Sequence, residues 1–101
     1  MTEPTDLCLR LRFFAPEQGR RAVLPNLLGG VYRPYIVIGG DPQGQYLGTQ
    51  VLSGLAEARF GEEVEVIACL TYPKVDYSGL KKGVTFMIME GARCVGEGCV
   101  I

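Results

Sequence analysis

The chain has 101 residues, of which 48% are apolar and 21% are charged, and its formal net charge is −1. This balance is typical of one globular domain and excludes a largely disordered chain. The lack of a net positive charge argues against non-specific binding to nucleic acid, which relies on a clustered positive field, so that only a local basic patch would serve that purpose.

Residues 1–6 are polar and include Pro4, so we expect a flexible tail there, followed by one domain over residues 7–101. From Leu7 to Phe13 apolar and polar residues alternate, with Cys8, Arg10 and Arg12 on the polar side. A period of two residues predicts a half-buried strand. Turn-forming residues at 16–19 end it.

The middle of the chain alternates between irregular segments and short strands. Residues 20–32 are interrupted by proline and glycine, and residues 35–38 are rich in β-branched side chains, which predicts a second strand. A turn cluster at 39–44 then favours a hairpin into a strand at 46–52. We expect a loop or a single helical turn at 53–59.

The last third of the chain predicts three more strands. Residues 63–72 alternate, with Val64, Val66, Ala68 and Leu70 on one face. A polar loop at 74–83 precedes a strand at 84–90 that is apolar on both faces. After a tight turn comes a final strand at 93–101. Its two interior glycines, at positions 96 and 98, indicate sharp curvature or a close approach of another backbone.

Six short strands, regular turn signals and 14 glycines predict an all-β antiparallel barrel or sandwich. No apolar run reaches the ~20 residues of a membrane helix. The N-terminus also lacks the pattern of a secretory signal. We therefore expect a cytoplasmic protein that does not cross a membrane.

The residue types give little support for catalysis or metal binding. The chain has four cysteines and no histidine, and no two cysteines form a Cys-x-x-Cys pair, so we expect free thiols and neither a metal nor another cofactor. Ser53 and Ser78 lack a base at a recognisable spacing. Cys94 and Cys99 are five residues apart, which on a regular strand places them on opposite faces. We expect no catalytic residues and no enzyme.

Residues 86–100 carry a more specific pattern, Phe-x-Ile-x-Glu-Gly-x-Arg-x-Val-Gly-x-Gly-x-Val, with nine named positions. This run resembles the closing hairpin of elongation factor Tu and its relatives. Further matches follow in the order of that family: residues 19–21 resemble its Gly-Arg stretch, residues 32–34 its Tyr-Arg-Pro, residues 61–64 its Gly-Asp-x-Val turn and residues 72–73 the pair before its last loop. The resemblance covers nearly the whole chain.

The resemblance implies the fold of the family's third, C-terminal domain, a six-stranded antiparallel Greek-key barrel, here as a stand-alone protein. The GTPase activity of the family lies in another domain with a Gly-x-x-x-x-Gly-Lys-Ser/Thr loop. That motif is missing here. We therefore expect neither binding nor hydrolysis of GTP.

The resemblance also implies candidate contacts to the T-arm of tRNA, at Arg20, Arg21, Glu90 and Gly91. Here Arg21 stands at the family's histidine position, and Tyr72 stands at its lysine position, which removes a cation. RNA contact through a local arginine patch at Arg20, Arg21 and Arg33 is therefore the alternative function, with tRNA as the ligand.

The leading hypothesis is a non-catalytic, protein-binding or accessory module in a translation-related setting, with a protein partner or a second copy. In the resembled family, one face of this barrel is covered by other domains. Met87 and Met89, with Leu27 and Leu28, are expected to form an apolar surface of this kind. Tyr32 and Arg33 are further interface candidates, and packing of the Tyr32 ring in the core or at its rim is the alternative. A third hypothesis is a degenerate fragment with a structural role only.

Overall fold

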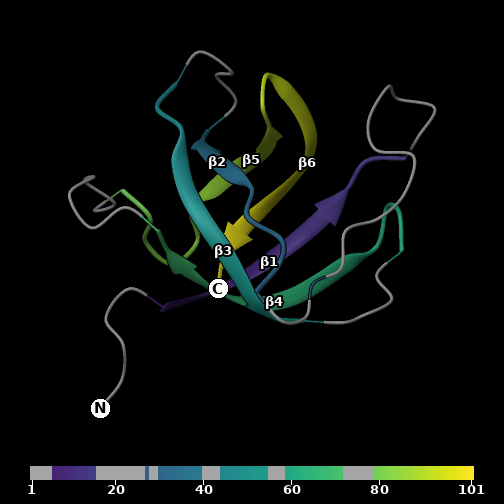
Figure 1. The fold of residues 1–101 in the computed structure, drawn as a ribbon, viewed down its shortest axis with the longest axis horizontal. Helices are drawn as coiled ribbons and strands as arrows, with labels where there is room; N and C mark the ends of the chain where they lie inside the picture. Colours follow the sequence, from purple (N-terminus) through teal and green to yellow (C-terminus); the bar gives the residue numbers. More distant parts are fainter. Residues whose placement is uncertain (1–5, 16–26, 28–29, 40–43, 55–58, 72–78) are drawn as a thin grey trace.

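The computed structural model describes residues 6–15, 27, 30–39, 44–54, 59–71 and 79–101. These residues form strands, turns and loops, without a helix (Figure 1). The strands are β1 (Asp6–Phe13), β2 (Tyr35–Ile38), β3 (Leu47–Ser53), β4 (Glu63–Leu70), β5 (Thr85–Glu90) and β6 (Arg93–Val100). All six predicted strands are present, with ends that differ from the prediction by no more than two residues.

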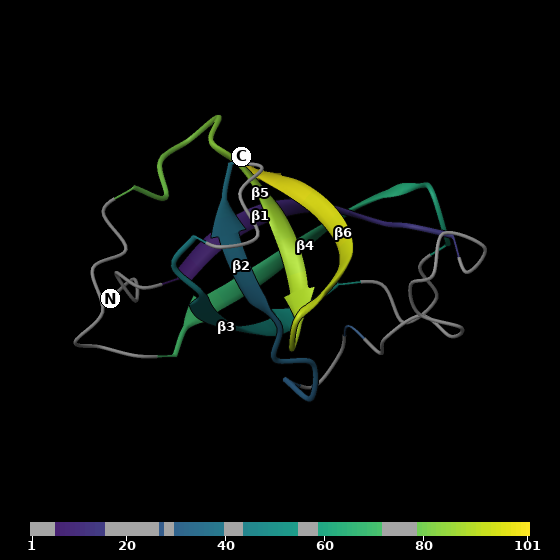
Figure 2. The ribbon, with the colours of Figure 1, turned by 90° about the horizontal axis from the view of Figure 1, so that it is seen from above.

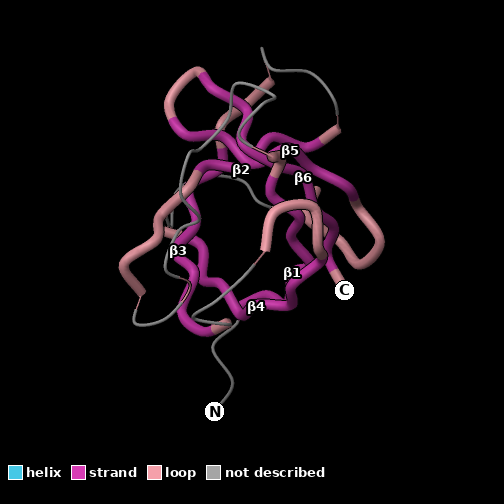
Figure 3. The backbone as a smooth tube through the Cα atoms, turned by 90° about the vertical axis from the view of Figure 1, so that its right-hand side faces the viewer, coloured by secondary structure: helices cyan, strands magenta, loops and turns pink. Residues whose placement is uncertain are grey.

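The strands close into one antiparallel barrel in the order β1-β4-β3-β2-β5-β6. Figure 3 shows the six strands following one another around this ring. The consecutive strands β2, β3 and β4 are neighbours, and β1 returns to lie beside β4, which is the Greek-key arrangement. The prediction of an antiparallel Greek-key barrel is therefore confirmed.

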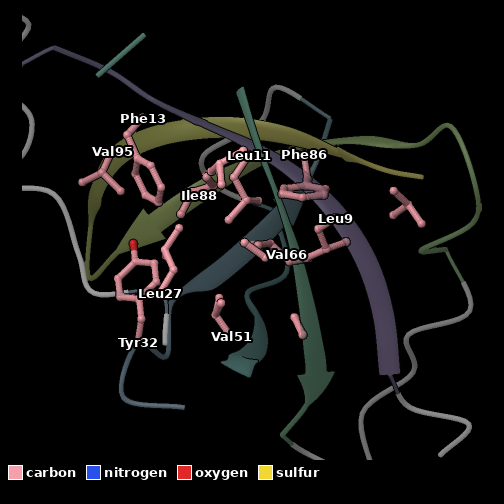
Figure 4. Close-up of a cluster of buried hydrophobic side chains, with 14 of the residues drawn as sticks. Leu9, Leu11, Phe13, Leu27, Tyr32, Val51, Val66, Phe86, Ile88 and Val95 are labelled. Atoms are coloured by element: carbon pink, nitrogen blue, oxygen red, sulfur yellow. The ribbon is translucent and has the colours of Figure 1, made fainter. Parts of the chain in front are cut away.

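Alternation along the strands decides which side chains fill the barrel. On β1, Leu9, Leu11 and Phe13 are buried in the core, whereas Arg10 and Arg12 lie on the outer face. On β4, Val64, Val66 and Ala68 are buried in the same way. Figure 4 shows side chains of β1, β3, β4, β5 and β6 meeting inside the barrel. Each fully buried aliphatic or aromatic side chain contributes about 1.5–3 kcal/mol to stability.

The two glycines of β6 allow it to pack closely on β1. A Cβ atom at Gly98 would lie 2.4 Å from the carbonyl oxygen of Arg10, and one at Gly96 would lie 2.4 Å from that of Arg12. Both distances are shorter than any real contact of this kind. Close backbone approach, one of the two predicted explanations for these glycines, is confirmed. Figure 2 shows that β6 is strongly curved along its length.

A β-bulge interrupts the pairing of β5 with β6. Ile88 pairs with Gly96 and Met89 pairs with Cys94, so that Val95 is an extra residue on β6. Val95 is nevertheless buried in the core. A β-bulge changes the face on which the residues before it lie relative to those after it.

Several predicted segments are only partly described. In the turn cluster at 39–44 and in the loop or helical turn at 53–59, residues 40–43 and 55–58 lie outside the described residues. Of the predicted tail at 1–6, Asp6 is the first residue of β1, and the others lie outside the described residues. The irregular segment at 20–32 is described only at residue 27 and at residues 30–32. The loop at 74–83 is described from residue 79 onward.

Candidate functional site

The hairpin between β5 and β6 holds two of the predicted RNA contacts, Glu90 and Gly91. Gly91 has a φ of 62°, as the first central residue of a tight two-residue turn requires. The hydroxyl of Tyr32 donates a hydrogen bond to a carboxylate oxygen of Glu90 at 2.7 Å. Tyr32 also packs edge-on against Phe13, with ring centroids 5.9 Å apart. The carboxylate of Glu90 is therefore fixed by a hydrogen bond from a buried aromatic residue of the barrel.

The predicted arginine patch is described only at Arg33, because Arg20 and Arg21 lie outside the described residues. Arg33 is exposed and lines a small pocket of about 360 Å³ together with Tyr35, Gly48, Thr49 and Thr71. The hydroxyl of Thr49 is already used, since it donates to the carbonyl oxygen of Pro34 at 2.9 Å. The pocket thus combines one guanidinium with an aromatic ring and a second threonine.

The prediction of an apolar surface around the methionines is wrong for two of the described residues, because both are buried. Leu27 is 0% exposed and belongs to the core, and Met89 is 1% exposed on β5. Tyr32, another interface candidate, is 8% exposed. Met87 is partly exposed, and Leu28 lies outside the described residues. Only Met87 among the described apolar candidates therefore offers a usable side chain at the surface.

A larger groove crosses the outer face of β5, β6, β1 and β4, with a volume of about 780 Å³. We call it the outer groove. The strand β6 lies between β5 and β1, so its outward side chains occupy the middle of the groove. The exposed or partly exposed residues that line it are Arg10, Arg12, Phe14, Gly39, Glu63, Thr85, Met87, Cys94, Glu97, Gly98 and Cys99.

Both arginines of this groove make an ion pair, although only one of the two partners, Glu97, also lines the groove. Arg10 pairs with Glu65 at 3.3 Å between its Nη2 atom and a carboxylate oxygen, and Arg12 pairs with Glu97. The arginines come from β1, and their partners come from the strands on either side of it. All four side chains keep between 39% and 66% of their surface exposed. The groove therefore presents charges of both signs rather than a basic stripe.

The prediction that Cys94 and Cys99 lie on opposite faces is wrong. Both line the outer groove, because the extra residue Val95 shifts Cys94 onto the face that carries Cys99. The four cysteines are free thiols, of which Cys8 is exposed and the others are partly exposed. The interior glycines at 96 and 98 were a signal, since glycine inside a strand often marks a bulge, but they did not place the extra residue at Val95.

Sequence reasoning also missed the outer groove as a site. Alternation placed Arg10 and Arg12 on the outer face of the first strand, but it did not reveal their neighbours. The pairing register supplies this information, since Arg12 lies opposite Glu63 on β4 and opposite Glu97 on β6. Predicting the groove would therefore require knowing which strands pair and in which register, and this is not a local property of the sequence.

The structure brings together no arrangement with an obvious catalytic chemistry in the part of the chain that it describes. There, no three His, Cys, Asp or Glu side chains are placed to hold a metal ion. No described helix has the length and apolar character needed to span a bilayer. The described residues do form two hollows in the surface, the outer groove and the pocket at Arg33.

Comparison with known proteins leaves the family open. No protein-family model matches the chain, and no curated protein matches it either. The resemblance to the third domain of elongation factor Tu therefore remains a prediction from the sequence, and the closed six-stranded barrel is what the structure establishes.

Proposed function

We propose that this chain is a non-catalytic binding module whose outer groove docks a protein partner. The observation that carries the proposal is the groove itself, which brings partly exposed apolar side chains together with charged side chains of both signs. Protein interfaces combine an apolar centre with a polar rim in this way, whereas nucleic-acid sites concentrate positive charge. The predicted kinship with elongation factor Tu adds a reason, because barrels of that kind pack against other protein domains.

The closed barrel limits how a partner is recognised. A closed barrel leaves little free strand edge, since each strand has a neighbour on both sides, so we expect a partner to bind without adding a strand to the sheet. Recognition then depends on outward side chains and on loops. The outer groove is the larger of the two hollows described above, and it brings side chains from four strands together.

A pair of variants tests the groove directly. Thr85 is exposed and lines the groove, whereas Ile67 is 43% exposed on the outer face of β4 and does not line it. Thr85→Trp fills the groove, and Ile67→Trp adds the same aromatic side chain elsewhere on the barrel. Both substitutions suit a strand. Denaturation of each variant establishes that it is folded.

The tagged protein and both variants are used to capture partners from native lysate, in halves with and without nuclease treatment. We expect to capture a specific protein both with and without nuclease treatment. The Ile67→Trp variant should still capture this protein, whereas the Thr85→Trp variant should not. Equal capture by both variants would show that the groove is not the docking site.

RNA binding is the second candidate, and the pocket at Arg33 is the observation that favours it. A guanidinium beside an aromatic ring suits a phosphate and an unstacked base. The resemblance adds Arg20, Arg21, Glu90 and Gly91 to this candidate. Recovery of tRNA that is lost in Arg33→Ala and in Arg20→Ala/Arg21→Ala, but retained in Thr85→Trp, would favour this function over the first.

A further inference from the structure

The outer groove carries one acidic side chain that makes no ion pair within the described part of the chain. Glu63 lies opposite Arg12 in the pairing of β1 with β4, but the guanidinium of Arg12 pairs with Glu97 on the other side. Arg10 likewise pairs with Glu65. Each described arginine of the groove therefore has a carboxylate, and Glu63 is left as an exposed negative charge at the β4 end.

The opposite end of the groove is apolar. The pairing register puts four outward side chains in one row across four strands, in the order Met87, Glu97, Arg12 and Glu63. Met87 on β5 is partly exposed, so it has apolar surface left to bury. The row therefore begins with the apolar side chain of Met87 and ends with a carboxylate that makes no ion pair with the described residues. The Arg12–Glu97 ion pair lies between them.

The distance along this row sets the spacing of a complementary ligand. Adjacent strands lie about 4.8 Å apart, so three strand spacings separate the backbones of Met87 and Glu63 by about 14 Å. An extended chain rises about 3.3 Å per residue and covers this distance in about four residues. Residues four apart on an extended chain also point to the same side.

We propose that the outer groove binds an extended protein segment with an apolar side chain at one position and an arginine or lysine four residues away. The apolar side chain packs on Met87, and the cation pairs with Glu63. This inference rests on the proposed function, because it specifies the partner that the groove accepts. Charge complementarity selects a basic segment over an acidic one.

Two charge reversals form a matched pair for the test. Glu63 and Glu62 are adjacent and exposed, and only Glu63 lines the groove. Glu63→Lys and Glu62→Lys change the net charge of the protein by the same amount. A difference between them therefore reports the groove rather than a general electrostatic attraction.

The full chain and both variants are used to select binders from a displayed library of random linear peptides at low ionic strength. We expect the unmodified chain and Glu62→Lys to enrich peptides with a basic residue four positions from an apolar residue. Glu63→Lys should instead enrich an acidic residue at that position. For one enriched basic peptide, Glu63→Lys should weaken binding by about fivefold, as expected for the loss of one exposed ion pair and its replacement by a repulsion.

Three results would overturn this inference: no enrichment, enrichment without the four-residue spacing, or equal weakening by both charge reversals. Its failure is distinguishable from that of the proposed function. If Thr85→Trp still abolishes partner capture while no such peptide binds, the groove docks a partner of different chemistry. If Thr85→Trp leaves capture unchanged, the proposed function fails as well.

Discussion

The hydroxyl of Tyr32 and the carboxylate of Glu90 are 2.7 Å apart, although the two residues are separated by 58 positions in the chain. The bond joins the segment before β2 to the end of β5. Tyr32 is a member of the core cluster, and Glu90 begins the turn into β6. The barrel thus orients, by a buried side chain, the carboxylate that the sequence suggested as an RNA contact.

Tyr32→Phe should lower the free energy of unfolding by about 1–2 kcal/mol. The variant removes a hydrogen bond to a charged group while retaining the ring that packs on Phe13. Chemical denaturation measures the change. Tyr46→Phe is the control, since the Tyr46 hydroxyl makes no hydrogen bond to the described residues, and it should stay within about 0.5 kcal/mol of the unmodified chain. Equal effects of the two variants would contradict the structural role of the Tyr32–Glu90 bond.

Gly98→Ala should destabilise the barrel by about 3 kcal/mol, because the added methyl group would meet both the carbonyl oxygen of Arg10 and the ring of Phe86. Backbone contacts of this kind are not relieved by a rotamer change. Equilibrium denaturation in urea measures the loss.

Gly61→Ala separates this clash from ordinary backbone strain. Gly61 has a φ of 77° and no atom within 4 Å of an added Cβ, so alanine there meets only the conformational cost. That cost is about 1 kcal/mol. A loss at position 98 no greater than that at position 61 would contradict the close packing of β6 on β1.

The ion pair between Arg12 and Glu97 should contribute less than about 1 kcal/mol to stability, because both side chains are about half exposed. A double-mutant cycle with Arg12→Ala and Glu97→Ala measures the coupling free energy. The coupling should shrink when the salt concentration rises. A coupling that exceeds this value and is insensitive to salt would show that the outer groove is closed to solvent.

The thiols should react with a disulfide reagent in two phases. Cys8 is exposed and should react first, whereas Cys69, Cys94 and Cys99 are partly exposed and should react more slowly. Cys8→Ser should remove the fast phase, and all four thiols should react in denaturant.

Air-oxidised protein should contain no Cys94–Cys99 bridge, because five residues of strand separate their Cα atoms by about 15 Å, well beyond the reach of a disulfide. Peptide mapping without reduction tests this last point.

Much of the fold could be read from local patterns. The alternation from Leu7 to Phe13 predicted both a strand and its buried face, because side chains of any strand alternate with a period of two. The glycines at 96 and 98 correctly indicated a close approach. The prediction failed for Met89 and Leu27, whose burial depends on what lies next to them in the barrel rather than on their own segments.

The sequence by itself determined the strands, the buried faces of β1 and β4 and the all-β class, since each of these depends on neighbours along the chain. The tertiary structure decided the order of strands around the barrel and the partners that face one another on its outer surface. It pairs Arg12 with Glu97 rather than with Glu63, joins Tyr32 to Glu90 and, through the bulge at Val95, brings Cys94 to the face of Cys99. These relationships connect residues through the pairing register of the closed barrel, and a periodic pattern in one segment carries no information about the segment that pairs with it.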